Sequence, residues 1–301
     1  MRLADVRPLA AALAAALCAT VAGAAANTPT TAEIVAASGR EEWRALDPAR
    51  TLYMQLPSGR VVIELAPEFA PQHAANILKL VGEHYFDGLA VIRVQDNFVA
   101  QWGDPDEKKP LGSARVKLPS EYVAGYDPSA SFLRLPDLDG YAPQAGFINS
   151  MPAGRDPAAR TQWLAHCYGA LGVARGNDPE SGNGSSLYVV IGQAPRQLDR
   201  NIAVVGHVWL GMELLATLPR GGGAMGFYEN ASQQVPIASL RRAADVPEAE
   251  RIALEVLRSE SRSFQRLVDA RRNRRDDFIR NSPGFVDSCN IPVPVRIRRP
   301  E

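Results

Sequence analysis

The chain has 301 residues, of which 46% are hydrophobic and 22% are charged, so it can bury the core of a globular protein. Its 33 Lys and Arg residues balance its 33 Asp and Glu residues. This balance gives no support to a nucleic-acid-binding or membrane-surface protein, since both usually carry an excess of basic side chains.

The first 26 residues have the pattern of a secretory signal peptide. Arg2 and Arg7 precede an alanine-rich apolar run over 9–22, and small-x-small cleavage patterns follow it. That run is shorter than the ~20 residues that span a bilayer, and no other apolar run in the sequence approaches membrane length. A lipoprotein site at Cys18 is a weaker alternative. We therefore expect an exported protein, most simply of the bacterial periplasm, without stable membrane insertion.

The next segments predict a lead-in and the start of a β domain. Residues 27–49 are expected to form an N-terminal lead-in with one short helix. Strands are predicted over 51–56 and 60–66, because a Pro-Ser-Gly turn separates two apolar, β-branched stretches. A helix with a broad apolar face is predicted from Pro71 to about Glu83.

The stretch 91–104, V-I-R-V-Q-D-N-F-V-A-Q-W-G-D, is the most informative in the sequence. Its β-branched residues predict a buried strand over Val91–Val94, but Arg93 interrupts the apolar run. Burying an unpaired guanidinium is costly, so Arg93 either pairs with a carboxylate in the core or serves a binding site. Phe98 and Gln101 would add an aromatic ring and an amide to such a site. Both interpretations stay open at this point.

A change of composition follows this strand. Residues 128–165 are rich in Pro, Gly, Ala and Asp with little periodicity, which predicts a long inserted loop with a functional or mobile character. Asp104, Asp106 and Glu107 suggest a cation site, although ordinary turn carboxylates are the commoner explanation.

Further strands are expected after the insertion, at 171–174, 185–191 and 202–209. A short helix is expected at 211–218. Gly221–Gly226 formally matches a dinucleotide-binding fingerprint, but it follows a helix rather than a strand, so we treat the match as accidental. A last strand is predicted at 234–240.

The C-terminal part, 244–301, is expected to contain a long helix from Val246 to about Asp277, followed by an extended tail. Four arginines at the end of this helix fit a solvated helix terminus better than a site for an acidic partner: Arg271, Arg272, Arg274 and Arg275. Cys167 and Cys289 remain after signal cleavage. They form either a disulfide in an oxidising compartment or two unrelated buried thiols, and both possibilities stay open.

The order of these motifs resembles the cyclophilin-type peptidyl-prolyl isomerase family between residues 50 and 243. The resemblance is carried by V-V-I-E-L-A-P-E-F-A-P at 61–71, N-I-L-K-L-V at 76–81, Y-F-D-G at 85–88, I-R-V at 92–94, N-F-V-A-Q-W-G-D-P at 97–105, G-A-L-G-V-A at 169–174, N-G-S-S-L-Y-V-V-I at 183–191 and L-D-R-N-I-A-V-V-G-H-V at 198–208. It implies a mostly β fold, a closed eight-stranded antiparallel barrel capped by two helices. The chain would add to this fold the enlarged loop and the C-terminal helical extension.

The resemblance also implies a set of site residues. Arg93 matches the catalytic arginine of the family. Residues that match or replace substrate-binding positions are Phe98, Val99, Gln101, Ala174, Tyr188 and Leu198. The family needs no cofactor, and the four histidines of this chain lack the spacing of metal ligands.

Several pocket positions depart from the family pattern. The family has a histidine where Ile92 stands, a methionine at Val99, and a phenylalanine at Tyr188. Further replacements are Arg175 for a backbone-binding asparagine, Ser186 for a second glutamine, Gln197 for a rim tryptophan and Ile202 for a pocket histidine. We therefore expect a shallower proline pocket of altered polarity and weak binding of cyclosporin-like macrocycles.

The expected function is peptidyl-prolyl cis-trans isomerisation of exported peptides or unfolded proteins. Rotation about an X–Pro bond meets a barrier of ~18–20 kcal/mol, and a cation aimed at the prolyl nitrogen weakens the resonance behind that barrier. Two alternatives remain, a catalytically weak proline-peptide-binding or chaperone-like module, and a scaffold whose insertion and C-terminal helix form an assembly surface. The sequence leaves the oligomeric state open.

Overall fold

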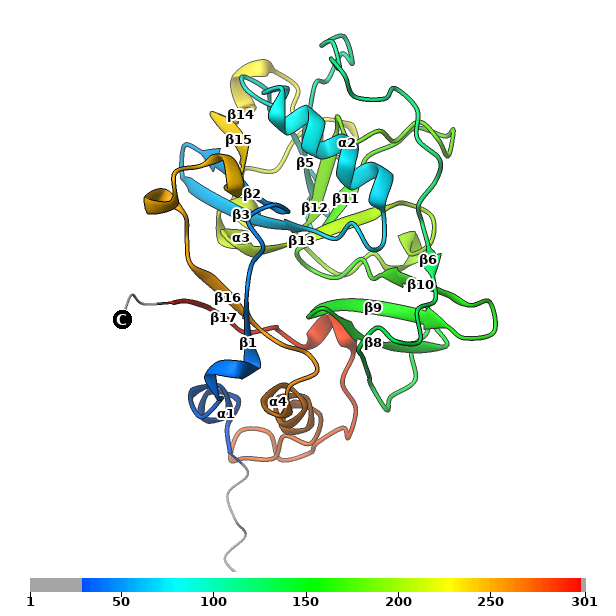
Figure 1. Cartoon of the computed structure of the whole chain (residues 1–301), viewed down its shortest axis with the longest axis vertical. Helices are drawn as coiled ribbons and strands as arrows, with labels where there is room; N and C mark the ends of the chain where they lie inside the picture. Colours follow the sequence, from blue (N-terminus) through cyan, green and yellow to red (C-terminus); the bar gives the residue numbers. More distant parts are fainter. Residues whose placement is uncertain (1–28, 299–301) are drawn as a thin grey trace, which may run out of the picture.

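The computed structural model describes residues 29–298, so the predicted signal peptide at 1–26 lies outside the described residues. The described chain contains a nine-stranded sheet, a five-stranded sheet and a three-stranded sheet. The nine-stranded sheet lies at one end of the molecule and the helices of the two chain ends lie at the other (Figure 1). Within the described range, no helix is long and apolar enough to cross a membrane.

The nine-stranded sheet is antiparallel and strongly curled. Its strands are β2 (Thr51–Leu56), β3 (Gly59–Leu65), β4 (Ala90–Val94), β5 (Val99–Gly103), β11 (Ala170–Val173), β12 (Leu187–Val190), β13 (Val204–Leu210), β14 (Val235–Pro236) and β15 (Ser239–Arg242). Their order is β14-β4-β5-β12-β11-β13-β3-β2-β15. The strands predicted at 51–56 and 60–66 pair as a hairpin with Leu56 opposite Gly59.

Two helices pack against this sheet. α2 (Pro71–Gly82) begins with a proline, whose missing N–H is not needed in the first turn. Its apolar face joins the core inside the sheet through Ile77, Leu80 and Val81. α3 (Met212–Ala216) is shorter than predicted and adds Leu215 to the same core.

The predicted closed eight-stranded barrel is corrected by the strand order, which is linear with β14 and β15 at its two edges. The strand expected at 234–240 is split, since β14 pairs with β4 whereas β15 pairs with β2. Between them, the N–H of Ile237 donates to Leu89 and that of Ala238 donates to Gln55. One short segment therefore connects both edges of a curled sheet, and no ladder joins its two outermost strands.

The predicted loop at 128–165 is also wrong, because about half of it forms four strands of the five-stranded sheet, whose remaining strand β6 (Ala124–Gly125) precedes it. The four strands are β7 (Phe132–Arg134), β8 (Gln144–Ile148), β9 (Met151–Asp156) and β10 (Thr161–Leu164), and the order in the sheet is β6-β10-β9-β8-β7. β8 and β9 are buried along almost their whole length, so they lack the alternation of a half-exposed strand. At Gly154, a Cβ atom would lie 2.6 Å from the Trp163 ring, which explains the small residue there.

The C-terminal helix predicted over 246–277 is corrected in its first half. Leu254–Leu257 instead forms β16, which lies between β1 (Trp43–Ala45) and β17 (Val295–Ile297) in the three-stranded sheet. All four β16 residues are buried. A short apolar run of this kind is typical both of the buried face of a helix and of a central strand, so the sequence pattern does not distinguish the two. The helix α4 (Arg262–Arg272) begins only after Ser261, whose hydroxyl accepts a hydrogen bond from the N–H of Phe264.

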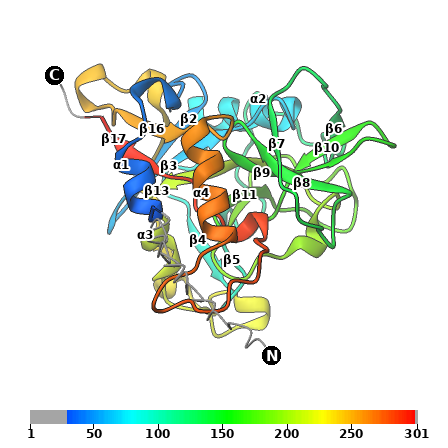
Figure 2. The ribbon, with the colours of Figure 1, turned by 90° about the horizontal axis from the view of Figure 1, so that it is seen from below.

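The N-terminal lead-in contributes to this same region. α1 (Thr31–Ala36) lies beside α4 (Figure 2). The Thr30 hydroxyl caps α1 by accepting from the N–H of Glu33, and the Glu33 carboxylate accepts in return from the N–H of Thr30. Short 3-10 turns occur at Arg40–Glu42, Arg196–Leu198, Ala224–Gly226, Ala231–Gln233, Ala243–Asp245, Glu248–Glu250 and Ser288–Asn290.

A disulfide joins the C-terminal tail to the rest of the molecule. The sulfur atoms of Cys167 and Cys289 are 2.00 Å apart, and the bridge spans 122 residues of sequence. Of the four arginines at the end of α4, Arg272 pairs with Asp137 at 3.0 Å and Arg274 pairs with Asp276 at 2.7 Å. The end of α4 is therefore bound to the segment between β7 and β8.

Candidate active site

Strand register places four of the relevant residues in one row across the sheet. Arg93 on β4 lies opposite Gln101 on β5, and Gln101 lies opposite Tyr188 on β12. Tyr188 in turn lies opposite Gly172 on β11. A Cβ atom at Gly172 would lie 2.2 Å from the Tyr188 ring, so the missing side chain provides the space for a tyrosine. The row therefore presents a cation, an amide and an aromatic ring on one face.

Arg93 is half-buried and donates only to neutral acceptors. Its Nε donates to the carbonyl of Met225 at 2.7 Å, one terminal nitrogen to Gln101 Oε1 at 3.1 Å, and the other to Gln95 Oε1. Gln101 is held in turn because its Nε2 donates to the Ser186 hydroxyl at 3.1 Å. Among residues 29–298, no carboxylate lies at ion-pair distance from Arg93. The interpretation of Arg93 as half of a core ion pair is therefore wrong.

Two aromatic rings flank this guanidinium. Its central carbon lies 5.6 Å from the Phe98 ring centroid and 5.3 Å from that of Phe227, within the range of cation–π contacts. Burial lowers the pKa of Arg93 from its ordinary value, because the charge has lost part of its hydration. A guanidinium remains charged at neutral pH even so, and it is fixed in direction by its three acceptors.

A cavity of about 500 Å³ lies in front of this row. The seven site residues named from the sequence all line it: Arg93, Phe98, Val99, Gln101, Ala174, Tyr188 and Leu198. Its lining also includes Arg175, Gly176, Asn177, Ile202, Met225 and Phe227. The sequence-predicted residues thus converge on one hollow that opens to solvent.

Met225 and Phe227 were missed by the sequence reasoning. They belong to the segment after α3, and Phe227 bridges to Arg93 as an isolated β pair. The signal in the sequence is the glycine-rich stretch at 221–226, whose match to a dinucleotide-binding fingerprint is accidental. Gly226 has φ of 79°, and a Cβ atom there would lie 2.5 Å from the Cα of Gln95. The glycines therefore let this segment approach β4 beside the cavity.

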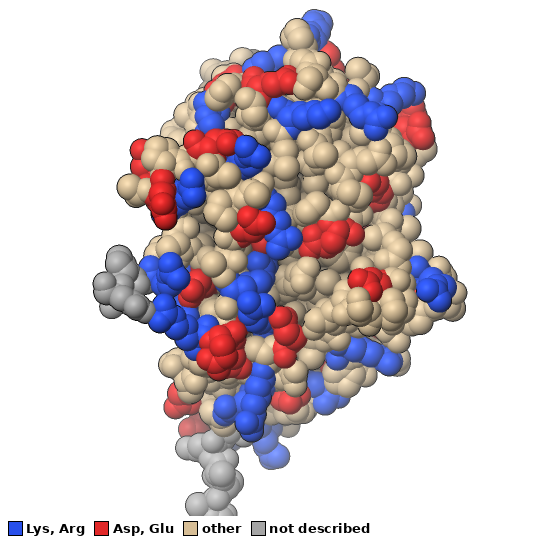
Figure 3. Space-filling view, in the orientation of Figure 1, with Lys and Arg blue, Asp and Glu red and all other residues tan. Residues whose placement is uncertain are grey.

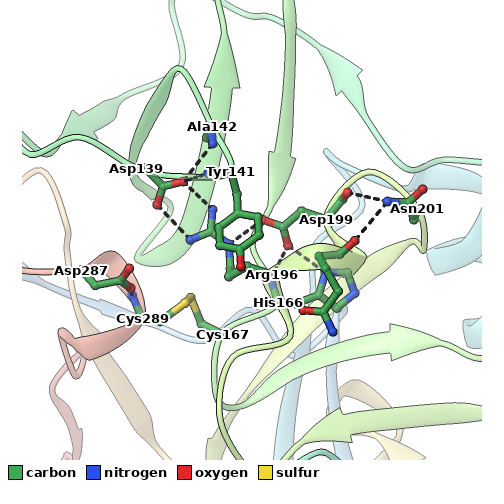
Figure 4. Close-up of polar contacts among 11 residues, drawn as sticks. Asp139, Tyr141, Ala142, His166, Cys167, Arg196, Asp199, Asn201, Asp287 and Cys289 are labelled. Atoms are coloured by element: carbon green, nitrogen blue, oxygen red, sulfur yellow. Dashed lines mark hydrogen bonds and ion pairs between the residues drawn. A yellow bond between two sulfur atoms is a disulfide. The ribbon is translucent and has the colours of Figure 1, made fainter.

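Behind the cavity, Tyr188 ends a chain of buried polar groups, since its hydroxyl lies 2.9 Å from His166 Nε2. His166 Nδ1 lies 2.9 Å from an Asp199 oxygen. Asp199 also binds Arg196 at 2.6 Å, and Arg196 forms a two-pronged pair with Asp139 of the inserted sheet region at 3.0 and 3.1 Å (Figure 4). The chain therefore links the cavity to the insertion.

The charged groups in this row of buried polar side chains determine which atoms carry the hydrogens of its hydrogen bonds. The Asp199 carboxylate accepts from Nδ1–H of His166, so Nε2 is the acceptor and the Tyr188 hydroxyl donates to it. Burial disfavours ionised Asp199, but hydrogen bonds from His166 and the charge of Arg196 outweigh it and hold the pKa of Asp199 below its usual range. Burial raises the pKa of Tyr188, which keeps its hydroxyl protonated.

Four of the departures from the family pattern line the cavity, namely Val99, Arg175, Tyr188 and Ile202. Ile202 is half-buried in the lining, and Gln197 is exposed. The guanidinium of Arg175 donates to the carbonyls of Asn201 and Gly176 and lies 5.5 Å from the Tyr122 ring centroid. Arg175 is therefore fixed beside the cavity and does not swing freely in solvent.

The carboxylates considered for a cation site behave as turn residues. Both oxygens of Asp104 accept backbone N–H groups, from Asp106, Lys108 and Lys109. Within the described range, no group of three or more His, Cys, Asp or Glu side chains is arranged to hold a metal ion.

Comparison with known proteins gives three consistent findings. The family model described as cyclophilin type peptidyl-prolyl cis-trans isomerase/CLD matches residues 51–242. A probable peptidyl-prolyl cis-trans isomerase of Brucella suis biovar 1 (strain 1330) is 30% identical over 183 residues, which cover 60% of this chain and 76% of that protein. The crystal structure of cyclophilin AquaCyp293 from Hirschia baltica aligns with a TM-score of 0.70 and 26% identity, covering 90% of this chain and 99% of that one.

The extent of the structural likeness adds one point. A coverage of 90% reaches well beyond residues 51–242, so segments outside the matched domain are also similar in the Hirschia baltica protein.

Proposed function

The chain belongs to the cyclophilin-type family and is a peptidyl-prolyl cis-trans isomerase, and we propose that its substrates are exported proteins. It would accelerate rotation of X–Pro bonds in these proteins as they fold. Its clients would be proline-containing peptides or unfolded chains. Support for export comes from the signal-like pattern of residues 1–26 and from the disulfide between Cys167 and Cys289, since disulfides persist in oxidising compartments such as the periplasm.

The observation that carries the proposal is the Arg93 guanidinium, which faces an open cavity and has no carboxylate partner among the described residues. In the planar amide, the prolyl nitrogen shares its lone pair with the carbonyl, and this resonance is lost in the twisted state. A donor aimed at that nitrogen stabilises the twisted state more than either planar state. Such a difference is what accelerates a reaction.

The other lining residues have supporting roles in this proposal. Phe98, Tyr188 and Leu198 would hold the proline ring, with Val99 and Ala174 completing the apolar surface. Gln101 orients Arg93 because its side-chain oxygen accepts a hydrogen bond from the guanidinium. Because rotation makes and breaks no covalent bond, the proposal needs no cofactor.

A protease-coupled isomerisation assay tests the proposal. We expect Arg93→Ala to lower kcat/KM by about 100-fold, the usual effect of removing one donor to a transition state. Arg220→Ala is the matched control, because Arg220 pairs with Asp96 on an exposed surface and does not line the cavity. That variant should keep full activity.

The alternative is a proline-peptide-binding module that uses the same cavity. Equal rates at the uncatalysed background for the wild type and Arg93→Ala, together with retained binding of a proline peptide, would establish that alternative and end the proposal of catalysis by Arg93.

A further inference from the structure

The cavity carries two positive charges and no lining carboxylate. Arg93 and Arg175 both line it, whereas its other lining residues are apolar or uncharged. Both guanidiniums are half-buried, so water screens them less than it screens a freely exposed arginine. The charges of Arg93 and Arg175 both act on the Tyr188 hydroxyl in the direction that lowers its pKa, so both arginines influence the same side chain of the cavity.

Both arginines retain unused donors. Three bonds hold Arg93, to Met225, Gln101 and Gln95, out of the five N–H groups of a guanidinium. Three bonds also hold Arg175, to the carbonyls of Asn201 and Gly176. Arg175 also interacts with the side chain of Tyr122, which leaves it fewer unused N–H groups than Arg93 has. Every acceptor named here for either guanidinium is uncharged.

The nearest acidic groups are engaged elsewhere. Asp199 lies behind the cavity and is neutralised by Arg196 at 2.6 Å. Asp178, on the loop after Arg175, pairs with Lys117 at 3.0 Å on the exposed side of that loop. Glu180 on the same loop is exposed as well. The positive charge of the cavity is therefore not cancelled from within the chain.

We propose that this cavity selects substrates with an acidic residue immediately before the proline, and that Arg175 is the residue that determines this preference. The inference rests on the proposed isomerase function and adds a substrate class to it. A carboxylate or a phosphorylated side chain would accept hydrogen bonds from the remaining N–H groups of Arg175, because the planar guanidinium pairs well with the oxygens of both groups.

The arrangement of the lining supports the position before the proline. Phe98, Tyr188 and Leu198 form the apolar part of the cavity, where a proline ring is held. Arg175, with Gly176 and Asn177, lines a polar part. If the ring occupies the apolar part and the prolyl nitrogen faces Arg93, the residue on the acyl side of the bond would lie towards Arg175 in this proposal.

The test uses a series of peptides that differ only in the residue before proline: Ala, Glu, phosphoserine and Lys. We expect kcat/KM for the Glu and phosphoserine peptides to exceed that for the Lys peptide by about tenfold at low ionic strength, a range typical of charge complementarity. Raising the salt to 0.5 M should lower the ratio, but less than it would for fully exposed charges, because salt screens partly buried pairs less.

Two variants separate charge from shape. Arg175→Gln should reduce the Glu-to-Lys ratio to about threefold, because only Arg93 then remains. Arg175→Lys keeps the charge and should preserve most of the ratio. The ratio of two substrates is measured on one protein, so a general loss of folded enzyme does not affect it.

Two outcomes would overturn the inference while leaving the isomerase function intact. One is equal kcat/KM for the Glu and Lys peptides with normal turnover of the Ala peptide. The other is an acidic preference that appears only when the Glu follows the proline. Absence of turnover for every peptide, in contrast, would contradict the proposed function itself.

Discussion

One buried hydrogen bond holds the Tyr188 side chain in place in the cavity lining. Its hydroxyl donates to His166, whose side chain is fully buried and whose other nitrogen is held by Asp199. His166 therefore has no water available as a replacement partner on the Nε2 side. The hydroxyl explains why a tyrosine replaces the phenylalanine of the family at this position.

We expect Tyr188→Phe to lower the free energy of unfolding by about 1–3 kcal/mol, the cost of leaving a buried acceptor without its donor. Urea denaturation measures it. Tyr122→Phe is the matched control, because the Tyr122 hydroxyl donates to the Pro179 carbonyl at an exposed site. Equal effects of both substitutions would show that burial of the His166 contact is unimportant.

His207 gives a pH dependence at the residue scale. Burial, with a smaller effect of the Arg44 charge, lowers the pKa of His207 from 6.5 to about 4. Its ring contacts Trp209, with centroids 4.4 Å apart, and it lies against Gly169. The folded protein therefore binds this proton only at much lower pH than the unfolded chain does.

The unfolded state binds the extra proton between pH 6.5 and 4, so the contribution of neutral His207 to stability is complete above pH 6.5 and is lost as the pH falls towards 4. We expect the wild type to lose roughly 2–3 kcal/mol more than His207→Gln between pH 7 and pH 4.5. Urea denaturation at both pH values measures the difference. Parallel losses in the two proteins would exclude His207 as the titrating group.

At the scale of elements, the disulfide connects three parts of the molecule. Cys167 follows β10 of the inserted sheet and directly follows His166 of the polar chain behind the cavity. Cys289 lies in the tail between α4 and β17. The same bond therefore constrains the insertion, the tail and the segment that carries His166.

We expect the double variant Cys167→Ser/Cys289→Ser to lose about 2–5 kcal/mol of unfolding free energy, because a loop of 122 residues is no longer closed in the unfolded chain. The midpoint of urea denaturation should fall and its slope should rise, because the unfolded chain without the bridge exposes more surface. The wild type treated with a reductant should match the variant. An unchanged midpoint in both samples would contradict a stabilising role for the bridge.

At the scale of the whole molecule, the three sheets share one hydrophobic cluster. Tyr53 and Val62 of the large sheet, Ala153 of the inserted sheet and Val256 of the C-terminal sheet are all buried in it. Buried Glu64 adds a polar connection, since it binds Arg44 of β1, Arg50 and the indole N–H of Trp209. The additions are therefore continuous with the main domain.

This continuity predicts a single cooperative unfolding transition. The four tryptophans lie in all three sheets, at Trp43, Trp102, Trp163 and Trp209. Fluorescence and far-UV circular dichroism should therefore give coincident denaturation curves. Two resolved transitions, with the inserted or C-terminal sheet melting first, would contradict the shared core.

The distribution of charge on the surface agrees with the equal numbers of basic and acidic residues in the sequence. Basic and acidic side chains are interspersed over the face shown in Figure 3 and are not separated by sign. The selective positive charge proposed above is accordingly local to one cavity and is not a property of the whole surface.

Sequence alone determined the elements whose patterns are local. The β2–β3 hairpin, α2 and the strand carrying Arg93 follow from alternation, helical periodicity and a proline at a helix start, which depend on neighbours in the chain. The motif order was enough to name the family and seven of the thirteen residues that line the cavity.

Only the tertiary structure decided the rest, because burial on both faces removes the pattern that sequence reasoning reads. β8, β9 and β16 are covered on both sides, so their composition resembled a loop or a helix until partner strands were present. The partners of Arg93, the contacts of Phe227 and the polar chain from Tyr188 to Asp139 join residues distant in sequence. Such contacts depend on how the elements pack, which local patterns do not specify.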